Sequence, residues 1–294
     1  VLLDLPGQLA PMSAATVRFI LNGEVIETEV VDPTRTVLQF LREDMRMTGT
    51  KEGCAEGDCG ACTVVVVEID RSNEGIELKT VNSCIQFLPT LDGKELITVE
   101  GLRGSDGGLH PVQQALVEHH GSQCGFCTPG FVMSLYALYR TNDNPSRQEI
   151  DDALAGNLCR CPGYRPIIAA AQSMHGQSDD WTSKDHDFQL RAIGRDDSLD
   201  NNCDGRRFFA PRDISTLAEL FESRPHATLL AGGTDIGLWV TKQHRELNTI
   251  IYMGRVRELL EQRVSATHLE IGGAVSLADA ITLITEHYPG LAEM

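Results

Sequence analysis

Two groups of four cysteines constrain this chain more than any other feature of its sequence. Eight of its nine cysteines fall into these groups. The first group is Cys54, Cys59, Cys62 and Cys84, and the second is Cys124, Cys127, Cys159 and Cys161. Short, defined spacings between thiols are typical of metal ligands. The sequence therefore predicts two metal centres, and the fold has to bring each group of thiols together.

The first group opens with C-x4-C-x2-C, the spacing of plant-type two-iron ferredoxins. Its loop carries Gly53, Gly57 and Gly60, where a chain that wraps a cluster needs positive φ. Such a loop also turns backbone N–H groups toward the sulfurs. Structural zinc favours paired C-x2-C units, and disulfides favour small, cysteine-dense chains from oxidising compartments. Buried structural thiols rarely show this spacing in a glycine-rich loop, so we expect a 2Fe-2S cluster.

The second group reads C-x2-C, a long interval, and then C-x-C. Cys124 and Cys127 would share one face of a helical turn, and Cys159 and Cys161 would share one side of an extended segment. Spacing alone leaves both a four-cysteine zinc site and a second cluster open. The neighbouring ferredoxin-type loop favours a cluster, because two clusters in one chain can pass electrons in sequence. Cys203, alone in a polar stretch, is interpreted as unligated.

Residues 16–101 follow an N-terminal extension, residues 1–15, and are predicted to form the ferredoxin domain. Asn22-Gly23 between two strand-like runs is a strong hairpin signal. A helix is expected at 36–44, and further strands include 63–68 and 76–81. A helix on a mixed sheet is typical of a β-grasp fold.

Residues 102–176 are predicted to form a four-helix bundle around the second cluster. Ser146 with Glu149 has the form of a capping box, and Pro111 and Gly121 are placed to open and close the first helix. The expected helices are 112–120, 131–140, 147–155 and 167–175.

Residues 177–207 are rich in Asp, Ser, Asn and Gly and are predicted to be a linker. The third part, 208–294, begins strand, helix, strand and then Gly232-Gly233, so the whole chain is expected to be an α+β multidomain protein. A Gly-Gly turn before a helix lets backbone amides approach a pyrophosphate. Many α/β turns contain Gly-Gly, however, so this turn and the similar Gly272-Gly273 are weak signals on their own.

Charge and hydropathy exclude two classes of function. The net charge of -17 argues against nucleic-acid binding, and no apolar run is long enough to span a membrane. The start of the chain lacks the pattern of a signal peptide, so reduced thiols point to the cytoplasm. We find no catalytic dyad, and His110, His119 and His120 are interpreted as caps of helix carbonyls rather than metal ligands.

Three segments resemble the molybdenum hydroxylases, and within that family the iron-sulfur and FAD subunit of the bacterial xanthine dehydrogenases. They are Gly49 to Thr63, Gln123 to Gly130 and Gly156 to Cys161. A fourth segment matches the first FAD pyrophosphate segment of the family. Its residues are Leu229, Leu230, Ala231, Gly232, Gly233, Thr234, Asp235 and Ile236.

The resemblance implies an electron relay. Electrons from xanthine or hypoxanthine would leave a molybdopterin centre on a separate large subunit, pass the bundle cluster and then the ferredoxin-type cluster, and reach FAD and NAD+. The expected assembly is a heterotetramer of two small and two large subunits. Gln123 would approach the pterin, an interpretation that we favour over that of a surface cap beside Cys124.

The resemblance also contains a departure. The family has a second flavin segment, of Ala-Thr-Ile-Gly-Gly-Asn type, and a further flavin region after it, so 208–294 is expected to be an incomplete FAD-binding domain. Three alternatives stay open at this point: an aldehyde or N-heterocycle hydroxylase subunit, a non-enzymatic ferredoxin-type carrier, and a zinc-stabilised interaction module.

Overall fold

The first part of the chain is a five-stranded mixed sheet. The computed structural model describes residues 16–28, 32–70, 74–104, 107–175 and 181–292. The strands are β1 Val17–Leu21, β2 Glu24–Thr28, β3 Thr63–Ile69, β4 Ile76–Asn82 and β5 Glu95–Ile97. Their order is β2-β1-β5-β3-β4, with β1 and β5 parallel and the other pairs antiparallel. The predicted hairpin at Asn22-Gly23 is confirmed, because both residues have positive φ.

Strand β3 is buried on both faces of this sheet. Val64 and Val66 pack in one cluster with Phe40 of η1 (Phe40–Asp44), the π-helical turn that continues α1 (Val37–Gln39). Val65 and Val67 pack in another cluster with helices of the second part. Alternate residues of a strand point to opposite faces, so an unbroken valine run is what a sheet covered on both sides requires. The predicted helix on a mixed sheet, the β-grasp arrangement, is confirmed.

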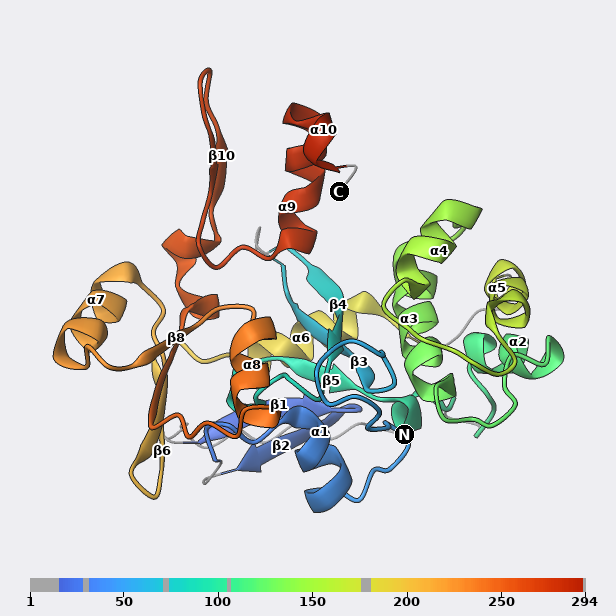
Figure 1. Cartoon of the computed structure of the whole chain (residues 1–294), viewed down its shortest axis with the longest axis horizontal. Helices are drawn as coiled ribbons and strands as arrows, with labels where there is room; N and C mark the ends of the chain where they lie inside the picture. The colour runs from blue at the N-terminus through green and yellow to red at the C-terminus, as the bar shows by residue number, and fades with distance from the viewer. Residues whose placement is uncertain (1–15, 29–31, 71–73, 105–106, 176–180, 293–294) are drawn as a thin grey trace.

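The second part contains the four predicted helices, which lie together on one side of the sheet (Figure 1). They are α2 Pro111–Glu118, α3 Thr128–Thr141, α4 Arg147–Leu154 and α5 Tyr164–Ser173. The capping box of α4 is present: Ser146 Oγ accepts from Glu149 N at 3.2 Å, and Glu149 Oε2 accepts from Ser146 N at 2.6 Å. His110 differs from its prediction, because its Nδ1 accepts from Val112 N and caps the start of α2.

The prediction of a linker over 177–207 is wrong for most of the described residues. Helix α6 (Ser183–Ile193) lies against the first sheet and buries Leu190 and Ile193, and β6 (Leu199–Cys203) pairs with β7 (Arg206–Ala210). The polar composition concealed a helix whose few apolar residues lie on one face. It also concealed a strand held by backbone pairing, which side-chain character does not reveal.

The third part is a second sheet with helices around it. Its strand order is β6-β7-β9-β8, where β8 is Thr228–Leu230 and β9 is Thr249–Tyr252. Helices α7 (Ile214–Ser223) and α8 (Thr234–Thr241) follow β7 and β8.

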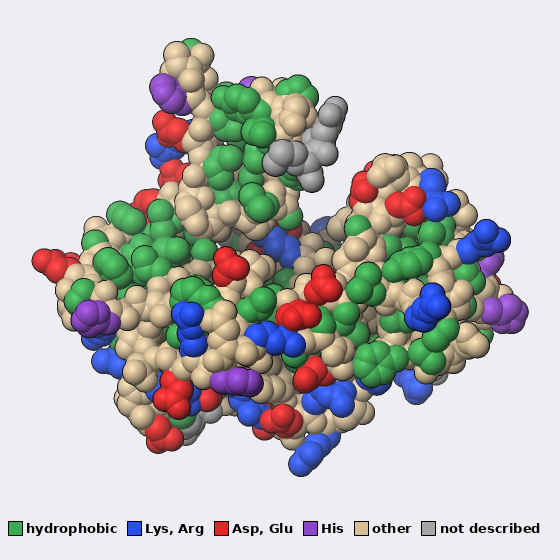
Figure 2. Space-filling model, in the orientation of Figure 1, with side chains coloured by type: hydrophobic (Ala, Val, Ile, Leu, Met, Phe, Trp, Pro, Cys, Tyr) green, Lys and Arg blue, Asp and Glu red, His purple; other side chains and the backbone are tan. Residues whose placement is uncertain are grey.

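The end of the chain projects from this body. It consists of the hairpin β10 (Gln262–Val264) and β11 (Leu269–Ile271), then α9 (Leu277–His287) and α10 (Pro289–Ala292), with hydrophobic side chains over much of the visible surface of α9 and α10 (Figures 1 and 2). The short 3-10 turns are η2 Leu88–Leu91, η3 Val99–Leu102, η4 Met253–Arg255 and η5 Arg257–Leu260. None of the described helices combines the length and apolarity needed to cross a membrane.

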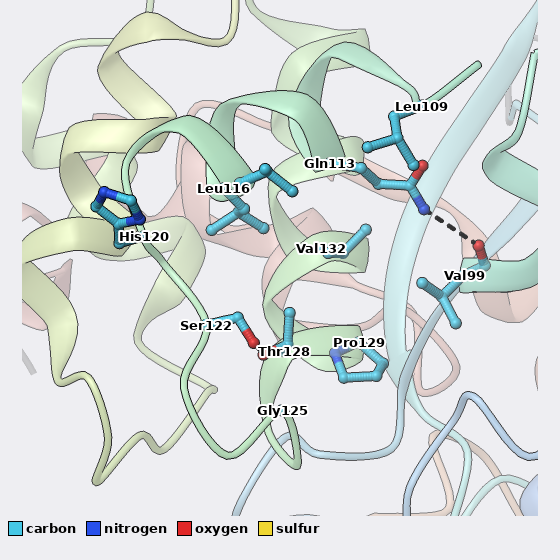
Figure 3. Close-up of a pocket in the computed structure, with 11 residues that line it drawn as sticks. Val99, Leu109, Gln113, Leu116, His120, Ser122, Gly125, Thr128, Pro129 and Val132 are labelled. Carbon is cyan, nitrogen blue, oxygen red and sulfur yellow. Dashed lines mark hydrogen bonds between the residues drawn. The ribbon is translucent and has the colours of Figure 1, made fainter.

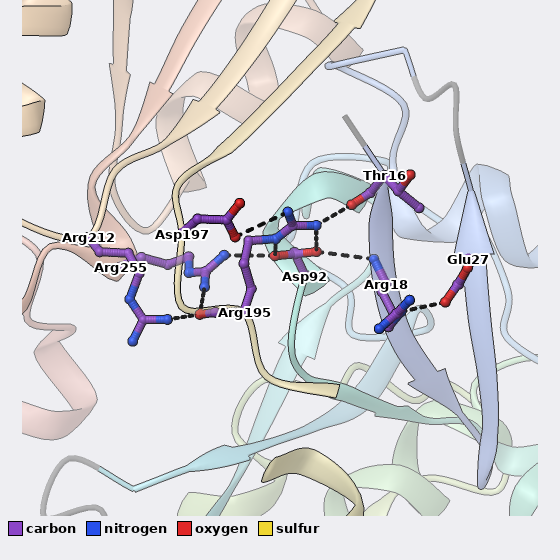
Figure 4. Close-up of polar contacts among 8 residues, drawn as sticks. All are labelled: Thr16, Arg18, Glu27, Asp92, Arg195, Asp197, Arg212 and Arg255. Atoms are coloured by element: carbon purple, nitrogen blue, oxygen red, sulfur yellow. Dashed lines mark hydrogen bonds and ion pairs between the residues drawn. The ribbon is translucent and has the colours of Figure 1, made fainter. Parts of the chain in front are cut away.

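A buried carboxylate joins the first part to the third (Figure 4). Asp92, which follows η2, is 1% exposed and accepts from Arg195 Nε at 2.9 Å and from Arg255 Nη1 at 2.7 Å. The backbone N–H of Arg18 in β1 also donates to Asp92, at 3.1 Å. The backbone carbonyl of Arg195 accepts from Arg255 Nη2 at 3.1 Å and from Arg212. One carboxylate therefore connects the sheet of the first part to the segment that follows α6 and to η4 of the third part.

Candidate iron-sulfur and flavin sites

The loop that carries the first three cysteines is shaped by glycines and by one strained residue. Gly57 and Gly60 have φ of +76° and +68°, as the sequence predicts. Gly53 is not in this region, so the prediction of positive φ there is wrong; a Cβ at Gly53 would lie 2.7 Å from Cys59 Sγ, so glycine is needed for space. Ala55, at φ +53°, takes the left-handed turn instead.

Backbone N–H groups converge on Cys54. The amides of Glu56, Asp58 and Cys59 all donate to Cys54 Sγ at 3.4 Å. Burial opposes ionisation of this thiol, but these donors outweigh burial and lower the pKa of Cys54. A sulfur surrounded by N–H donors is stabilised as a thiolate, the form that binds iron.

Cys62 and Cys84 form the buried half of the first group. A hydrogen bond from Cys84 lowers the pKa of Cys62 to about 7 against the effect of burial, and the same contact raises the pKa of Cys84. Ser83 Oγ donates to the Cys62 carbonyl at 2.7 Å, and Asn82 Nδ2 donates to the Gly57 carbonyl at 2.8 Å. These bonds tie the turn that carries Cys84 to the ligand loop.

The second group is assembled at the ends of the bundle helices. Cys124 lies in the loop between α2 and α3, Cys127 immediately precedes α3, and Cys159 and Cys161 lie between α4 and α5. The Phe126 amide and the Cys161 thiol lower the pKa of Cys124. Burial and the neighbouring Cys159 raise the pKa of Cys127 to about 12.

The eight thiols thus lie as four close pairs. They are Cys54 with Cys59, Cys62 with Cys84, Cys124 with Cys161, and Cys127 with Cys159. A tetrahedral zinc site brings all four thiolates to one ion, whereas a 2Fe-2S cluster takes two thiolates on each of two irons. The pairing fits the cluster better than zinc.

The two cysteine groups are in direct contact, and we call this contact, between residues 157–158 and residues 59–60, the seam. Leu158 N, next to Cys159, donates to the carbonyl of Cys59 at 3.0 Å. Buried Asn157 donates to the Gly60 carbonyl at 3.0 Å, and its Oδ1 accepts from Ser134 Oγ at 2.7 Å.

Glycines allow this close approach of the two ligand loops. A Cβ at Gly60 would lie 2.2 Å from the Gly156 carbonyl oxygen, and a Cβ at Gly130 would lie 2.1 Å from the Gly60 carbonyl oxygen. Real Cβ contacts are longer than this, so the two ligand regions can touch only because these residues are glycines.

The Gly232-Gly233 turn lies where β8 ends and α8 begins. Gly233 has φ of +81°, and a Cβ at Gly232 would meet nothing, so the turn is open above the start of α8. Thr234 and Asp235 are exposed in the first turn of this helix, and Leu230 is buried beneath it. Free backbone amides at a helix N-terminus are suited to a pyrophosphate. The residues fit the predicted FAD segment, and Asp235 is the one group of unfavourable charge.

Helix α8 also packs directly on the turn that carries Cys84. A Cβ at Gly237 would lie 2.8 Å from the Ile85 carbonyl oxygen, and Leu238 packs against a small core made of Leu38, Cys62, Cys84 and Ile85. The predicted flavin segment and the first cysteine group therefore share an interface. The similar turn at Gly272-Gly273 has another use: a Cβ at Gly272 would lie 2.2 Å from the Leu259 carbonyl oxygen, so this turn packs against η5.

Gln123 is exposed beside exposed Cys124, a position consistent with either of its two interpretations. Near it an open pocket of about 520 Å³ lies between α2, the start of α3 and η3 (Figure 3). The lining is mostly apolar, and His120 is its one titratable member.

Several residues of these sites were not predicted. Asn157, Gly130 and Asn82 act through contacts between segments far apart in the chain, as does Lys242, whose Nζ donates to the Cys54 carbonyl, and spacing within a motif does not reveal such contacts. Asn157 could have been suspected, since it lies two residues before a cysteine, but only the fold shows it buried between the two groups.

Comparison with known proteins matches three consecutive segments of the chain. Residues 19–87 match a 2Fe-2S iron-sulfur cluster binding domain, residues 98–172 a [2Fe-2S] binding domain, and residues 202–294 an FAD binding domain in molybdopterin dehydrogenase.

Curated relatives extend the match over most of the chain. A xanthine dehydrogenase from Drosophila pseudoobscura pseudoobscura is 35% identical over 94% of this chain and 24% of the relative. An aldehyde oxidase 2 from Macaca fascicularis is 32% identical over 94% of this chain and 24% of the relative. A solved aldehyde oxidoreductase from Desulfovibrio gigas is 36% identical over 54% of this chain and 16% of that chain, with a TM-score of 0.48.

The chain belongs to the iron-sulfur and FAD part of the molybdenum hydroxylase family. It spans about a quarter of the length of the curated relatives it matches. The predicted family and the predicted fold class are confirmed.

Proposed function

We propose that this molybdenum hydroxylase chain is the electron-transfer part of a xanthine dehydrogenase. In this proposal each cysteine group holds one 2Fe-2S cluster, residues 229–236 hold FAD, and a partner subunit holds molybdopterin. Bound clusters carry single electrons and bound FAD can accept two, which suits FAD to reduce NAD+. The residues of the chain position the clusters and FAD, shield them from solvent and set the charge around them.

The seam at Leu158 and Cys59 carries this proposal. A single hydrogen bond joins the backbone of the first cysteine group to the residue before Cys159. A direct hydrogen bond between the two cysteine groups gives electrons a short path from one cluster site to the other, and two separate structural metal sites do not require such a contact. On the other side of the first group, Ile85 contacts α8, which begins at the predicted flavin segment.

Exposure suggests the direction of the relay. Cys124 is exposed, whereas Cys62 and Cys84 are buried, so a partner's cofactor can approach the second group most closely. Gln123, exposed beside Cys124, would then lie at the boundary with molybdopterin. The first group lies between the second group and the flavin segment.

Metal analysis and EPR test the core of the proposal. The purified chain should contain four irons and four acid-labile sulfides in total, as two 2Fe-2S clusters require, and show two distinct signals after dithionite reduction. Cys59→Ser should remove one signal and spare the other, while Cys203→Ser should spare both. Two zincs and no EPR signal would refute the proposal, and loss of both signals in Cys59→Ser would show that the groups are wrongly assigned.

The substrate and the acceptor need the whole enzyme. We expect the chain together with its molybdopterin subunit, as an assembly of two copies of each, to oxidise xanthine and hypoxanthine with NAD+. The aldehyde oxidase among its relatives favours a second candidate, an aldehyde-oxidising enzyme of the same family. Steady-state rates with xanthine and with an aldehyde, each with and without NAD+, distinguish the two.

A further inference from the structure

Lys242, in the third part of the chain, contacts the loop that carries the first cysteine group. Its Nζ donates to the backbone carbonyl of Cys54 and lies 3.6 Å from Glu56 Oε2. The residue follows α8 directly, and its backbone N–H donates to the Leu238 carbonyl at 2.9 Å. The ammonium group is thus delivered by a helix whose other end is the predicted flavin segment.

The surroundings hold this lysine in place. Gly237, five residues earlier, fits against the Ile85 carbonyl with no room for a Cβ, and Leu238 packs on the core that contains Cys84, so α8 lies in direct contact with the turn that carries Cys84. Cys54 and Glu56, the two residues that Lys242 contacts, flank Ala55 with its left-handed φ of +53°. This conformation is costly for alanine, and contacts on both sides help to hold it.

The same short segment aims its amides at the Cys54 sulfur. Glu56 N donates to Cys54 Sγ at 3.4 Å, so Lys242 contacts both ends of the turn that builds this donor set. One-electron reduction adds a negative charge to a cluster and its thiolates. A fixed cation nearby stabilises that charge and raises the reduction potential. The Glu56 carboxylate offsets part of this effect.

We propose that Lys242 is a positioning residue that couples the flavin-bearing part of the chain to the first cluster and raises the reduction potential of that cluster. The inference rests on the proposed function. Its consequence is directional: a higher potential at the first cluster favours electron transfer to it from the second cluster.

The test is an EPR-monitored redox titration of the full chain with both clusters loaded. Lys242→Met keeps the length and apolar character of the stem but removes the charge, Lys242→Glu reverses the charge, and Lys242→Arg keeps it. Lys184→Met, at an exposed lysine on α6, is the control. The readout is the midpoint potential of each cluster signal.

Lys242→Met should lower the ratio of reduced to oxidised first cluster, at a fixed potential, by about threefold to tenfold, where tenfold corresponds to about 59 mV for a one-electron couple. Lys242→Glu should lower it further, Lys242→Arg should retain it, and the second cluster should not shift in any variant. Unchanged midpoints in Lys242→Met and Lys242→Glu, with both signals present, would overturn this inference and leave the proposed function standing. A wild-type chain without iron or sulfide would overturn both.

Discussion

Replacing Asp92 by asparagine should lower the free energy of unfolding more than replacing a surface aspartate by asparagine does. The carboxylate is 1% exposed, Arg195 beside it is fully buried and Arg255 is 13% exposed. Asparagine keeps the shape but removes the charge, and one of its two atoms becomes an N–H donor facing guanidinium donors. Asp92→Asn therefore removes the buried carboxylate that the two arginines share, while Asp197 Oδ1 still lies 3.6 Å from Arg195 Nη1.

The expected cost follows from this geometry. Breaking a buried ion pair by removing one partner costs about 3–5 kcal/mol, because the remaining charge is left uncompensated. For a chain of this size each kcal/mol lowers the melting temperature by about 2–4 °C, so we expect a fall of about 6–20 °C. Asp187→Asn breaks the partly exposed Arg191–Asp187 pair, at 2.8 Å, and should cost at most about 0.5 kcal/mol.

Thermal unfolding of the two variants and the wild type, at equal iron content, measures the difference. The visible absorption follows the clusters, which the first and second parts hold, and near-UV circular dichroism follows the aromatic side chains of the whole chain, which include Trp239 of α8 in the third part. Because Asp92 joins the first part to the third, both transitions should shift in Asp92→Asn. A melting temperature of Asp92→Asn within about 2 °C of that of Asp187→Asn would mean that the two variants differ by about 1 kcal/mol or less. That result would refute the assignment of Asp92 as a structural junction.

Three further changes probe the seam and the sheet. Asn157→Ala should lower the free energy of unfolding by about 1–3 kcal/mol, because it leaves the buried Gly60 carbonyl and Ser134 hydroxyl without this hydrogen-bond partner. Urea unfolding measures this difference. Gly60→Ala should broaden or abolish both EPR signals, since its Cβ would overlap the Gly156 carbonyl, whereas Gly205→Ala, at a similar positive φ in an open turn, should not affect them. Glu68, despite burial, has its pKa lowered from 4.5 to about 2 by Lys94 and a second lysine. Its carboxylate therefore stabilises the fold above pH 4.5 and loses this effect as the pH falls toward 2, so Glu68→Gln should lose about 3 kcal/mol at pH 7 and show a flatter acid limb in unfolding measured against pH.

Local signals explain which parts of the fold could be predicted. The Asn22-Gly23 turn, the Ser146 capping box and the valine run of β3 depend on neighbours within a few residues, so the sequence contains the whole argument for each. The two cysteine groups belong to the same class, because ligand spacing is a property of one short segment.

The predictions that were wrong or missing share one physical cause, which is packing between segments that are distant in the sequence. The helix at 183–193 was missed because its composition is polar, and it forms because Leu190 and Ile193 find a cover on the first sheet. The role of Gly53 was misjudged because its space is limited by Cys59 Sγ, six residues away, rather than by its own φ. Lys242 and Asp92 act through partners that are distant in the sequence: Lys242 contacts Cys54, and Asp92 contacts Arg18, Arg195 and Arg255.

The order of the three sites in space differs from their order in the chain, and α6 explains why. Along the sequence the first cysteine group comes first, the second group follows, and the flavin segment comes last. In the fold the first group contacts the second group through Cys59 and contacts α8 through Ile85, so it lies in the middle. A relay that ends at flavin needs this arrangement, and the chain can produce it only by returning from the bundle across the first sheet. Helix α6 makes that return by lying against β1, β3 and β4, so the segment whose composition predicted a linker brings the predicted flavin segment back to the first cysteine group.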